Sequence, residues 1–434
     1  RRYKSQFIET VNMKLNPEKE KLPWNKTAIT PGTAFMGKLN KNVSLYFEIN
    51  KSKFPCQHII VSGSNIAGEG EHKIFEYIRD NSIRHRDQKT VIHGLDADLI
   101  MLCLNHLHIS KNIHLYRETP HFIQNISSDL DPNETYLIDI YELADNIADD
   151  LTGNVNVEHD KKMKIVRDYI FVCLFLGNDF MPHFPSMNIR TTGMEILLAA
   201  YKNVCGSKGK FLLHENKIIW KNVREFINYL SQDENLYLRE EYKTRNKIEK
   251  RYIPNKTPEE KVKYFNLVPI KEREVEKYIN PFETHWEERY YKMLFDIEIT
   301  DERRKQISVN FLEALEWNIS YYTTGCKDWN WCYKYHYPPL LKDLSKFVPY
   351  FDTEFIENKK KNPVSSYTQL AYVLPRNSLD LLPFNMRQKL LIEYSDWYQL
   401  DFKFKWSFCK YFWESHIDMP EIDINKLKLI TEKT

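Results

Sequence analysis

Short apolar runs that end in acidic, glycine-containing loops alternate with helical patterns over the first 200 residues. The run from His58 to Ser62 is typical of a buried strand, and Lys89 to His93 is a second such run. Each run leads through a loop into apolar residues with helical spacing, first around Ile74 to Ile78 and then at Leu99 to Leu104. This repeated order predicts parallel β-α units, whose active groups lie at the carboxyl ends of the strands.

Longer helical patterns follow. Met163 to Leu176 predicts a long helix that stops at Gly177, because glycine is a common residue just beyond the last helical turn. The segment from Leu370 to Pro375 reads as a further piece of core. One stripe of apolar residues spaced four apart predicts an amphipathic helix in the second half of the chain: Ile307, Phe311, Leu315 and Ile319.

Composition divides the chain into three predicted parts. Residues 1–200 read as an α/β domain, and residues 286–434 as a mostly helical region in which aromatic residues are frequent. Residues 201–285 are rich in Lys, Glu, Asn and Tyr and contain a charged run over residues 239–251. We expect this middle part to be a connector or insertion that is helical in places and partly exposed.

The overall composition is that of a globular protein. Of the 434 residues, 42% are hydrophobic, so the chain is not intrinsically disordered. The formal net charge is only +2, so affinity for nucleic acid would have to come from local clusters such as Arg1-Arg2 or Lys243 to Arg251.

The cysteines and the lack of long apolar runs limit the cellular compartments in which we expect the protein. The seven cysteines are odd in number and have no C-x-x-C spacing, which argues against a disulfide framework or a zinc site. No apolar stretch reaches the roughly 18 residues of a membrane span, and no signal peptide is visible. We therefore expect a protein of a reduced intracellular compartment, cytoplasmic or nuclear, with no membrane partner.

Five carboxylates carry the main chemical signal. They occur in three short clusters, each beside an apolar run, where an unpaired acid is costly to bury. Acids that converge in such a place need a cation, and oxygen ligands select a hard ion such as Mg²⁺ or Mn²⁺. The commonest use of such a site is the hydrolysis or transfer of phosphate esters. The five candidate metal ligands and catalytic residues are Glu69, Glu71, Asp96, Asp98 and Asp179.

Each cluster also has a simpler interpretation. An acid just before a helix is often only a cap or a partner of the helix dipole, and Glu69, Glu71 and Asp98 taken singly fit that role equally well. Asp179 taken alone could close a helix end together with Asn178. The conjunction of three clusters favours the metal site. His72 and His183 fit a supporting or core role better than a ligand role, because the set is rich in oxygen.

The segments around these acids resemble motifs of the Xrn/Rat family of 5′→3′ exoribonucleases. The acids lie in Ser62 to Ile74, Gly94 to Leu99 and Phe175 to His183, and Ile29 to Met36 is similar to another family signature. The resemblance covers nearly the whole chain, because further matches follow in family order: Trp286 to Tyr291, Gly325 to Trp331, His336 to Pro339 and Val373 to Pro375.

The resemblance implies a fold and an activity. The fold would be a nuclease core of the PIN/flap-endonuclease type with a central, mostly parallel sheet, joined to a mainly α-helical second region. The activity would be stepwise, two-metal hydrolysis of single-stranded RNA that carries a 5′-monophosphate, releasing mononucleotides, with the five acids binding two Mg²⁺ or Mn²⁺ ions. Arg1 and Arg2 resemble the end of the basic motif that grips the 5′-phosphate. Trp331, or its neighbour Trp329, resembles the aromatic residue on which the terminal base stacks, and core packing is the alternative for both.

The sequence also departs from the family pattern. It lacks the family's opening segment, which carries two further metal-binding aspartates, and the long C-terminal extensions of the cytoplasmic members. We therefore expect an N-terminally truncated, compact member whose isolated chain is a weak enzyme. Lys327, Asp328 and Lys334 depart mildly from the pattern of the stacking wall.

Two other functions stay open. One is a catalytically impaired RNA-binding or scaffold relative, against which the retention of five acids argues, because holding them together is electrostatically costly. The other is a flap-type DNA nuclease, which would not need the aromatic second half.

Overall fold

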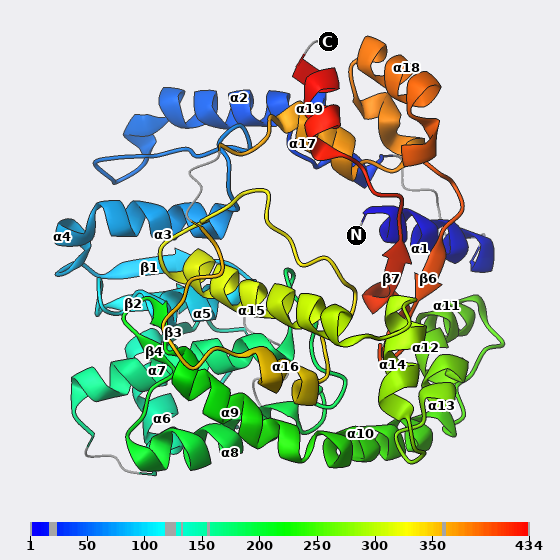
Figure 1. Cartoon of the computed structure of the whole chain (residues 1–434). Coiled ribbons are helices and arrows are strands. Elements are labelled where there is room, and N and C mark those ends of the chain that lie inside the picture. Colours follow the sequence, from blue (N-terminus) through cyan, green and yellow to red (C-terminus); the bar gives the residue numbers. More distant parts are fainter. Residues whose placement is uncertain are drawn as a thin grey trace. The chain divides into compact units, whose positions relative to one another are not determined.

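The chain folds into two compact units, and each unit combines segments that are far apart in the sequence. A computed structural model describes residues 2–16, 24–117, 127–131, 133–153, 157–357 and 362–432 (Figure 1). The first unit comprises Arg1–Gly68, Thr244–Asn280 and Asn362–Thr434, and the second comprises Glu69–Lys243 and Pro281–Lys361. The limits of the three parts defined from the sequence stay a prediction, because these units do not follow the linear order of the chain.

A small mixed sheet lies in the second unit, with the strand order β1-β2-β3. β1 (Thr90–His93) and β2 (Ile113–Tyr116) are parallel, and β3 (Leu137–Asp139) runs antiparallel to β2. β1 leads directly to α5 (Asp98–Asn105), as the sequence predicted. The sheet and its flanking helices give this unit the expected α/β character (Figure 1).

The prediction of a strand at His58 to Ser62 was wrong. This segment has no regular secondary structure, and Ile60 is 65% exposed. A strand exists only where it pairs with another strand, and none of the described strands pairs with this run. The apolar run therefore belongs neither to a sheet nor to a buried strand.

Helices make up most of the rest of the second unit. A short hairpin of β4 (Leu213–His214) and β5 (Lys217–Ile218) accompanies them. The α-helices are α3 (Gly70–Asp80), α4 (Ser82–His85), α6 (Ile140–Thr152), α7 (His159–Cys173), α8 (Gly193–Val204), α9 (Trp220–Gln232), α10 (Glu234–Glu249, which continues into the first unit), α14 (Trp286–Phe295), α15 (Asp301–Thr323) and α16 (Leu341–Phe347).

The core of the second unit confirms the longer helical patterns. α7 is extended by a 3₁₀ turn, η4 (Leu174–Leu176), and the chain leaves it at Gly177 with φ of +79°. A Cβ at Gly177 would lie 2.6 Å from the backbone nitrogen of His183, so only glycine fits this close turn. In α15 the predicted apolar stripe is fully buried, at 0% or 1% exposure.

Part of the segment expected to be a charged connector belongs to this core. α9 is strongly amphipathic, and its apolar face joins the main hydrophobic cluster of the unit. The buried residues on that face are Trp220, Val223, Phe226, Ile227 and Leu230.

The first unit has a separate hydrophobic core, which centres on α17 (Ser366–Val373), α18 (Phe384–Glu393) and α19 (Ile424–Glu432). Leu370, Ala371 and Leu374 are fully buried there, as the sequence predicted for that segment. Its other elements are α1 (Arg2–Leu15), α2 (Ala34–Ile49), α11 (Pro258–Asn266), α12 (Val268–Lys271), α13 (Glu274–Ile279) and the antiparallel pair β6 (Lys403–Lys405) and β7 (His416–Asp418).

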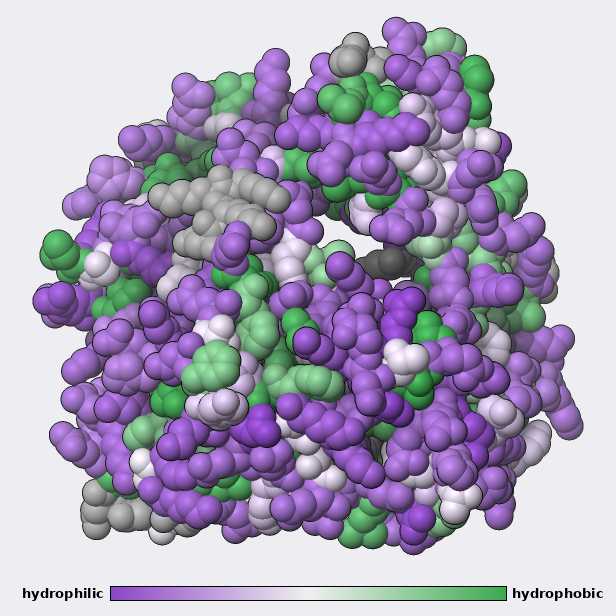
Figure 2. Space-filling view, in the orientation of Figure 1, coloured by the Kyte–Doolittle hydropathy of each residue, from purple (hydrophilic) through white to green (hydrophobic). Residues whose placement is uncertain are grey.

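Polar residues dominate the visible surface. Figure 2 shows mostly hydrophilic side chains with small, separate groups of apolar ones, which agrees with a composition that is 28% charged. No helix within the described ranges is both long enough and apolar enough to cross a membrane.

A buried ionic network stabilises the first unit. The Glu276 carboxylate on α13 is 1% exposed and accepts hydrogen bonds from Arg245, Arg273 and the backbone N–H of Phe408. The Nε–oxygen distances are 2.9 Å for Arg245 and 2.5 Å for Arg273. Removing one partner of such a set leaves the other charges buried without compensation.

We expect Glu276→Gln to destabilise the protein by about 3–5 kcal/mol, because the buried Arg245 guanidinium loses the charge of Glu276 and Arg273 is left with its ion pair to Glu249 at 3.0 Å. Glu274→Gln on the same helix is the matched control, since Glu274 is exposed and should change stability by less than about 1 kcal/mol. Urea unfolding of both variants measures the difference, and equal stabilities would contradict the role given to the network.

Candidate active site

The five predicted acids lie at the starts of two helices and just beyond the end of a third. Glu69 occupies the residue before α3, but its side chain makes no capping hydrogen bond, and Glu71 lies in the first turn. Asp98 is the first residue of α5, and Asp96 stands two residues earlier. Asp179 follows the turn that ends α7. The cap interpretation is therefore not supported for Glu69.

Electrostatic coupling links the three segments. Burial raises the pKa of Glu69, and the neighbouring charge of Glu71 raises it further, with added contributions from Asp179 and Asp98. Burial likewise raises the pKa of Asp98, and the charges of Asp96, Asp179 and Glu71 add to this effect. Every acid of the set thus lies within electrostatic reach of Glu69 or Asp98, across segments separated by up to 110 residues.

The chemistry of this cluster suits a hard divalent cation. All five side chains offer carboxylate oxygens, and a cation would relieve the repulsion that raises the pKa values of Glu69 and Asp98. However, within the part of the chain that the structure describes, no group of three or more His, Cys, Asp or Glu residues is arranged so that it could hold a metal ion. The carboxylate oxygens are suitable ligands for Mg²⁺ or Mn²⁺, but the described side chains are not close enough together to coordinate an ion.

His72 lies beside the cluster and contacts Glu69. It is buried, and its Nε2 lies 3.7 Å from Oε2 of Glu69. Burial, aided by the charge of Arg79, lowers the pKa of His72 to about 4, so its ring is neutral at neutral pH. The contact with Glu69 is therefore no ion pair, and the position agrees with the supporting role favoured for His72.

Two tyrosines that the sequence analysis missed contact the acids. The Tyr321 hydroxyl donates to Oε2 of Glu69 over 3.3 Å, and the Tyr322 hydroxyl lies beside Asp98 and acts to lower the pKa of that carboxyl. Burial raises the pKa of both phenols far above neutrality, so both stay protonated donors. No local signal marks them, because they lie near the end of an amphipathic helix, α15, whose pattern is that of ordinary core packing.

The aromatic candidates form part of a stack of rings. Tyr321 stacks on His72 at 3.7 Å and on Trp317 at 4.8 Å, and Trp317 stacks on Trp331 at 5.4 Å between ring centroids. Trp331 also donates its indole N–H to Glu313, whereas Trp329 is 39% exposed. One face of the Trp331 ring is therefore packed against the protein, and its role in base stacking stays a prediction.

The two candidate arginines belong to the first unit. Arg2 begins α1, and its Nε donates to Oγ1 of Thr30 over 3.0 Å. Arg1 lies outside the described residues. Their proposed contact with a 5′-phosphate stays a prediction.

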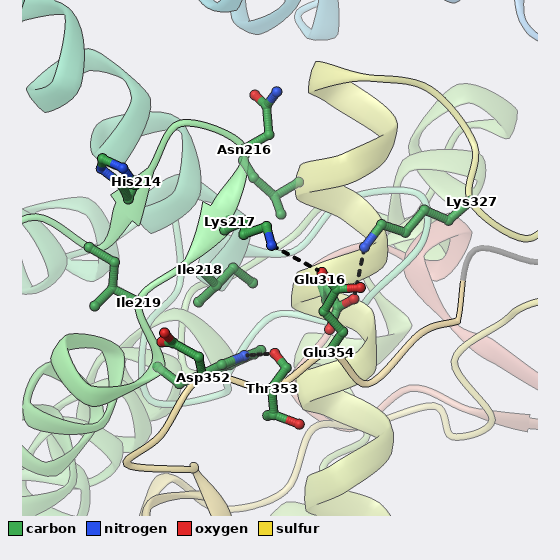
Figure 3. Close-up of a pocket in the computed structure, with 12 residues that line it drawn as sticks. His214, Asn216, Lys217, Ile218, Ile219, Glu316, Lys327, Asp352, Thr353 and Glu354 are labelled. Carbon is green, nitrogen blue, oxygen red and sulfur yellow. Dashed lines mark hydrogen bonds and ion pairs between the residues drawn. The ribbon is translucent and has the colours of Figure 1, made fainter.

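A separate cavity of about 530 Å³ lies in the second unit, between the β4–β5 hairpin and α15 (Figure 3). Its lining includes Lys217, Glu316, Lys327 and Glu354, but none of the five acids. Lys327 pairs with Glu316 at 3.0 Å and Lys217 pairs with Glu354 at 3.7 Å, so these charges compensate one another.

Comparison with known proteins identifies relatives over most of the chain. Residues 1–119 match the family model described as the XRN 5'-3' exonuclease N-terminus, a PIN-like nuclease domain, and residues 159–277 and 270–433 match the Xrn1 helical domain. The chain is 25% identical to 5'-3' exoribonuclease 2 of Arabidopsis thaliana over 97% of its own length and 53% of that protein. It is 27% identical to 5'-3' exoribonuclease 1 of Saccharomyces cerevisiae over 86% of its length and 32% of that protein. The human 5'-3' exoribonuclease 1 is also 27% identical, over 93% of this chain and 26% of the human protein. The chain thus spans about half the length of the plant relative, and less of the other two.

The raised pKa values predict an unusual dependence of stability on pH. The folded state binds protons at Glu69 and Asp98 more tightly than the unfolded chain, so the free energy of unfolding falls as the pH rises through the range in which these carboxyls ionise. We expect Glu69→Gln to raise the free energy of unfolding at neutral pH, without metal, by up to about 1 kcal/mol, and to have no such effect in acid.

Urea unfolding in EDTA at pH 4 and pH 7.5 measures this. Glu76→Gln is the matched control, because Glu76 is exposed on the same helix. A Glu69→Gln protein that is less stable than the wild type at pH 7.5 would show that repulsion does not dominate at this position.

Proposed function

Because the chain belongs to the XRN family of 5′→3′ exonucleases, we propose that it carries the catalytic centre of a 5′→3′ exoribonuclease. Its curated relatives are named 5'-3' exoribonucleases. The observation that carries the proposal is the electrostatic coupling of Glu69 and Asp98 to each other and to the three remaining carboxylates, which come from three separate segments. Acids kept close at this electrostatic cost are typical of a cation-dependent active site.

The proposed substrate is single-stranded RNA with a 5′-monophosphate, and the proposed cofactor is a pair of Mg²⁺ or Mn²⁺ ions. The ions would supply an activated water and stabilise the leaving oxygen. Their ligands would be the five acids: Glu69, Glu71, Asp96, Asp98 and Asp179. Arg1 and Arg2 would bind the 5′-phosphate through their guanidinium groups, and Trp331 would stack on the terminal base.

The cysteines support a location in a reduced compartment, the cytoplasm or the nucleus. All seven are free. Burial raises the pKa of the Cys103 and Cys205 thiols to about 12, so these two stay unreactive thiols at neutral pH.

Progressive release of mononucleotides from 5′-monophosphorylated RNA in Mg²⁺ tests the activity, with the chain expressed at its full natural length. We expect Asp98→Asn to reduce turnover by at least 10³-fold while RNA binding changes little, because a metal ligand that acts on the transition state is lost. The matched control is Asp87→Asn, since Asp87 is exposed and lies outside the cluster.

RNA with a 5′-hydroxyl should be digested more slowly, because the charged group that the arginines would bind is absent. Unchanged turnover in Asp98→Asn would contradict the metal assignment. RNA binding without turnover by the wild type in Mg²⁺ and in Mn²⁺ would favour the scaffold alternative.

The two candidate tryptophans can be separated by binding. If Trp331 stacks on the terminal base, Trp331→Leu should weaken the binding of short 5′-monophosphorylated RNA by about 1–3 kcal/mol. Trp329→Leu is the matched control and should have less effect. Fluorescence anisotropy with the same RNA measures both, and the reverse order would assign the stacking role to Trp329.

A further inference from the structure

α15 is the element to which all three acid segments are connected. It lies in the core of the second unit and packs against α5 (Figure 1). Three polar side chains stand at positions i, i+3 and i+4 on one face of its last turns, so they point the same way. These residues are Asn318, Tyr321 and Tyr322, and they are only 0%, 5% and 3% exposed.

Tyr321 reaches the glutamate segment. Its hydroxyl donates to Oε2 of Glu69, and its ring is held between His72 and Trp317 at centroid distances of 3.7 and 4.8 Å. Because other rings pack against both faces of the Tyr321 ring, its rotation is restricted and the position of its hydroxyl is fixed. Glu69 itself is half exposed and has no capping role, so this bond restricts a side chain that would otherwise be mobile.

Tyr322 reaches the aspartate pair and spans the helix that carries it. Its hydroxyl lies beside the Asp98 carboxylate, close enough to lower the pKa of that acid against the effect of burial. Its backbone carbonyl accepts from Nδ2 of Asn105, the last residue of α5, over 2.7 Å. Asn105 is 3% exposed, so this second bond is made away from water. One residue of α15 therefore bonds the end of α5 and lies against the acid at its start.

Asn318 reaches the third segment through Asn178. Its Nδ2 donates to the carbonyl of Ala314 within α15, which leaves Oδ1 to accept from Nδ2 of Asn178 over 2.8 Å. Oδ1 of Asn178 in turn accepts from the backbone N–H groups of Phe180 and Met181, at 2.9 and 3.1 Å. These bonds close the turn that contains Asp179, so Asn318 holds that turn in place without touching the acid.

The opposite face of α15 is anchored independently. Glu316 lies about half a helical turn away from the three residues, next to the cavity shown in Figure 3. Its carboxylate accepts from Nζ of Lys327 at 3.0 Å and from the backbone N–H of Phe355 at 2.6 Å. With one face fixed to these loops, rotation of α15 would break bonds on both sides.

We propose that Asn318, Tyr321 and Tyr322 form a positioning face that sets the spacing of the three acid segments and thereby the affinity of the site for divalent cations. The three residues touch no substrate and act through Glu69, Asp98 and the turn around Asp179. This inference rests on the proposed function only in taking the five acids as cation ligands.

Binding of Mn²⁺ alone to the purified chain tests the proposal, with free Mn²⁺ measured by electron paramagnetic resonance. We expect Tyr321→Phe and Tyr322→Phe each to weaken Mn²⁺ binding by about 10-fold or more, which is the usual effect of removing a partner of a metal ligand. Asn318→Ala should do the same, and if it fails to fold, the two tyrosine variants still decide the result.

Tyr290→Phe is the matched control. Tyr290 is also buried, and its hydroxyl donates to the carbonyl of Pro338 over 2.9 Å, remote in sequence from every acid. Tyr290→Phe also removes a buried phenol hydroxyl, but one that contacts no acid segment. This variant should therefore change Mn²⁺ affinity by less than twofold. If Tyr290→Phe lost a comparable amount of Mn²⁺ affinity, the losses in the other variants would reflect general destabilisation of the protein. That result would overturn the proposal.

In RNA digestion, the positioning variants should need at least tenfold more Mg²⁺ for half-maximal turnover, while the KM for RNA stays within twofold of the wild type. A raised KM with an unchanged Mg²⁺ requirement would overturn the proposal. If the wild type binds Mn²⁺ but digests no RNA, the proposed activity fails, and the Mn²⁺ affinities alone decide on the positioning face. A wild type that binds no Mn²⁺ would overturn both.

Discussion

Mutual repulsion among partly buried carboxylates is the constraint around which the second unit is organised. Burial and neighbouring charges both raise the pKa values of Glu69 and Asp98, so the cluster is unfavourable in isolation. The hydroxyl of Tyr321, the neighbouring phenol of Tyr322 and the packing of α15 in the main core offset part of that cost. The cluster lowers the stability of the fold, so we explain its presence by a chemical function. Proteins tolerate such unfavourable arrangements mainly at functional sites.

Features that depend on neighbouring residues in the sequence were largely predictable. The helix after the glutamate motif, the β1–α5 unit, the stop at Gly177 and the buried stripe of α15 all follow from local periodicity or from the special backbone of glycine. The strand expected at His58 to Ser62 was a wrong prediction because a strand depends on a distant segment and not only on its own residues. Pairing is a property of two segments, and one apolar run cannot specify its partner.

The candidate site was predictable only in part. The acids could be found from their motifs, but Asn318, Tyr321 and Tyr322 lie more than 130 residues beyond Asp179, in a helix that reads as ordinary amphipathic core. Two compact units, each assembled from distant segments, likewise cannot be read from linear composition. Hydrogen bonds across such distances are set by the packed fold, not by local propensity.

The late place of α15 in the sequence has a consequence for synthesis. All five acids precede residue 180, whereas the helix that holds their segments begins at Asp301 and ends at Thr323. A growing polypeptide would therefore expose the acids well before the residues that align them. On this account the acids of a nascent chain would bind divalent cations more weakly until the whole of α15 had left the ribosome.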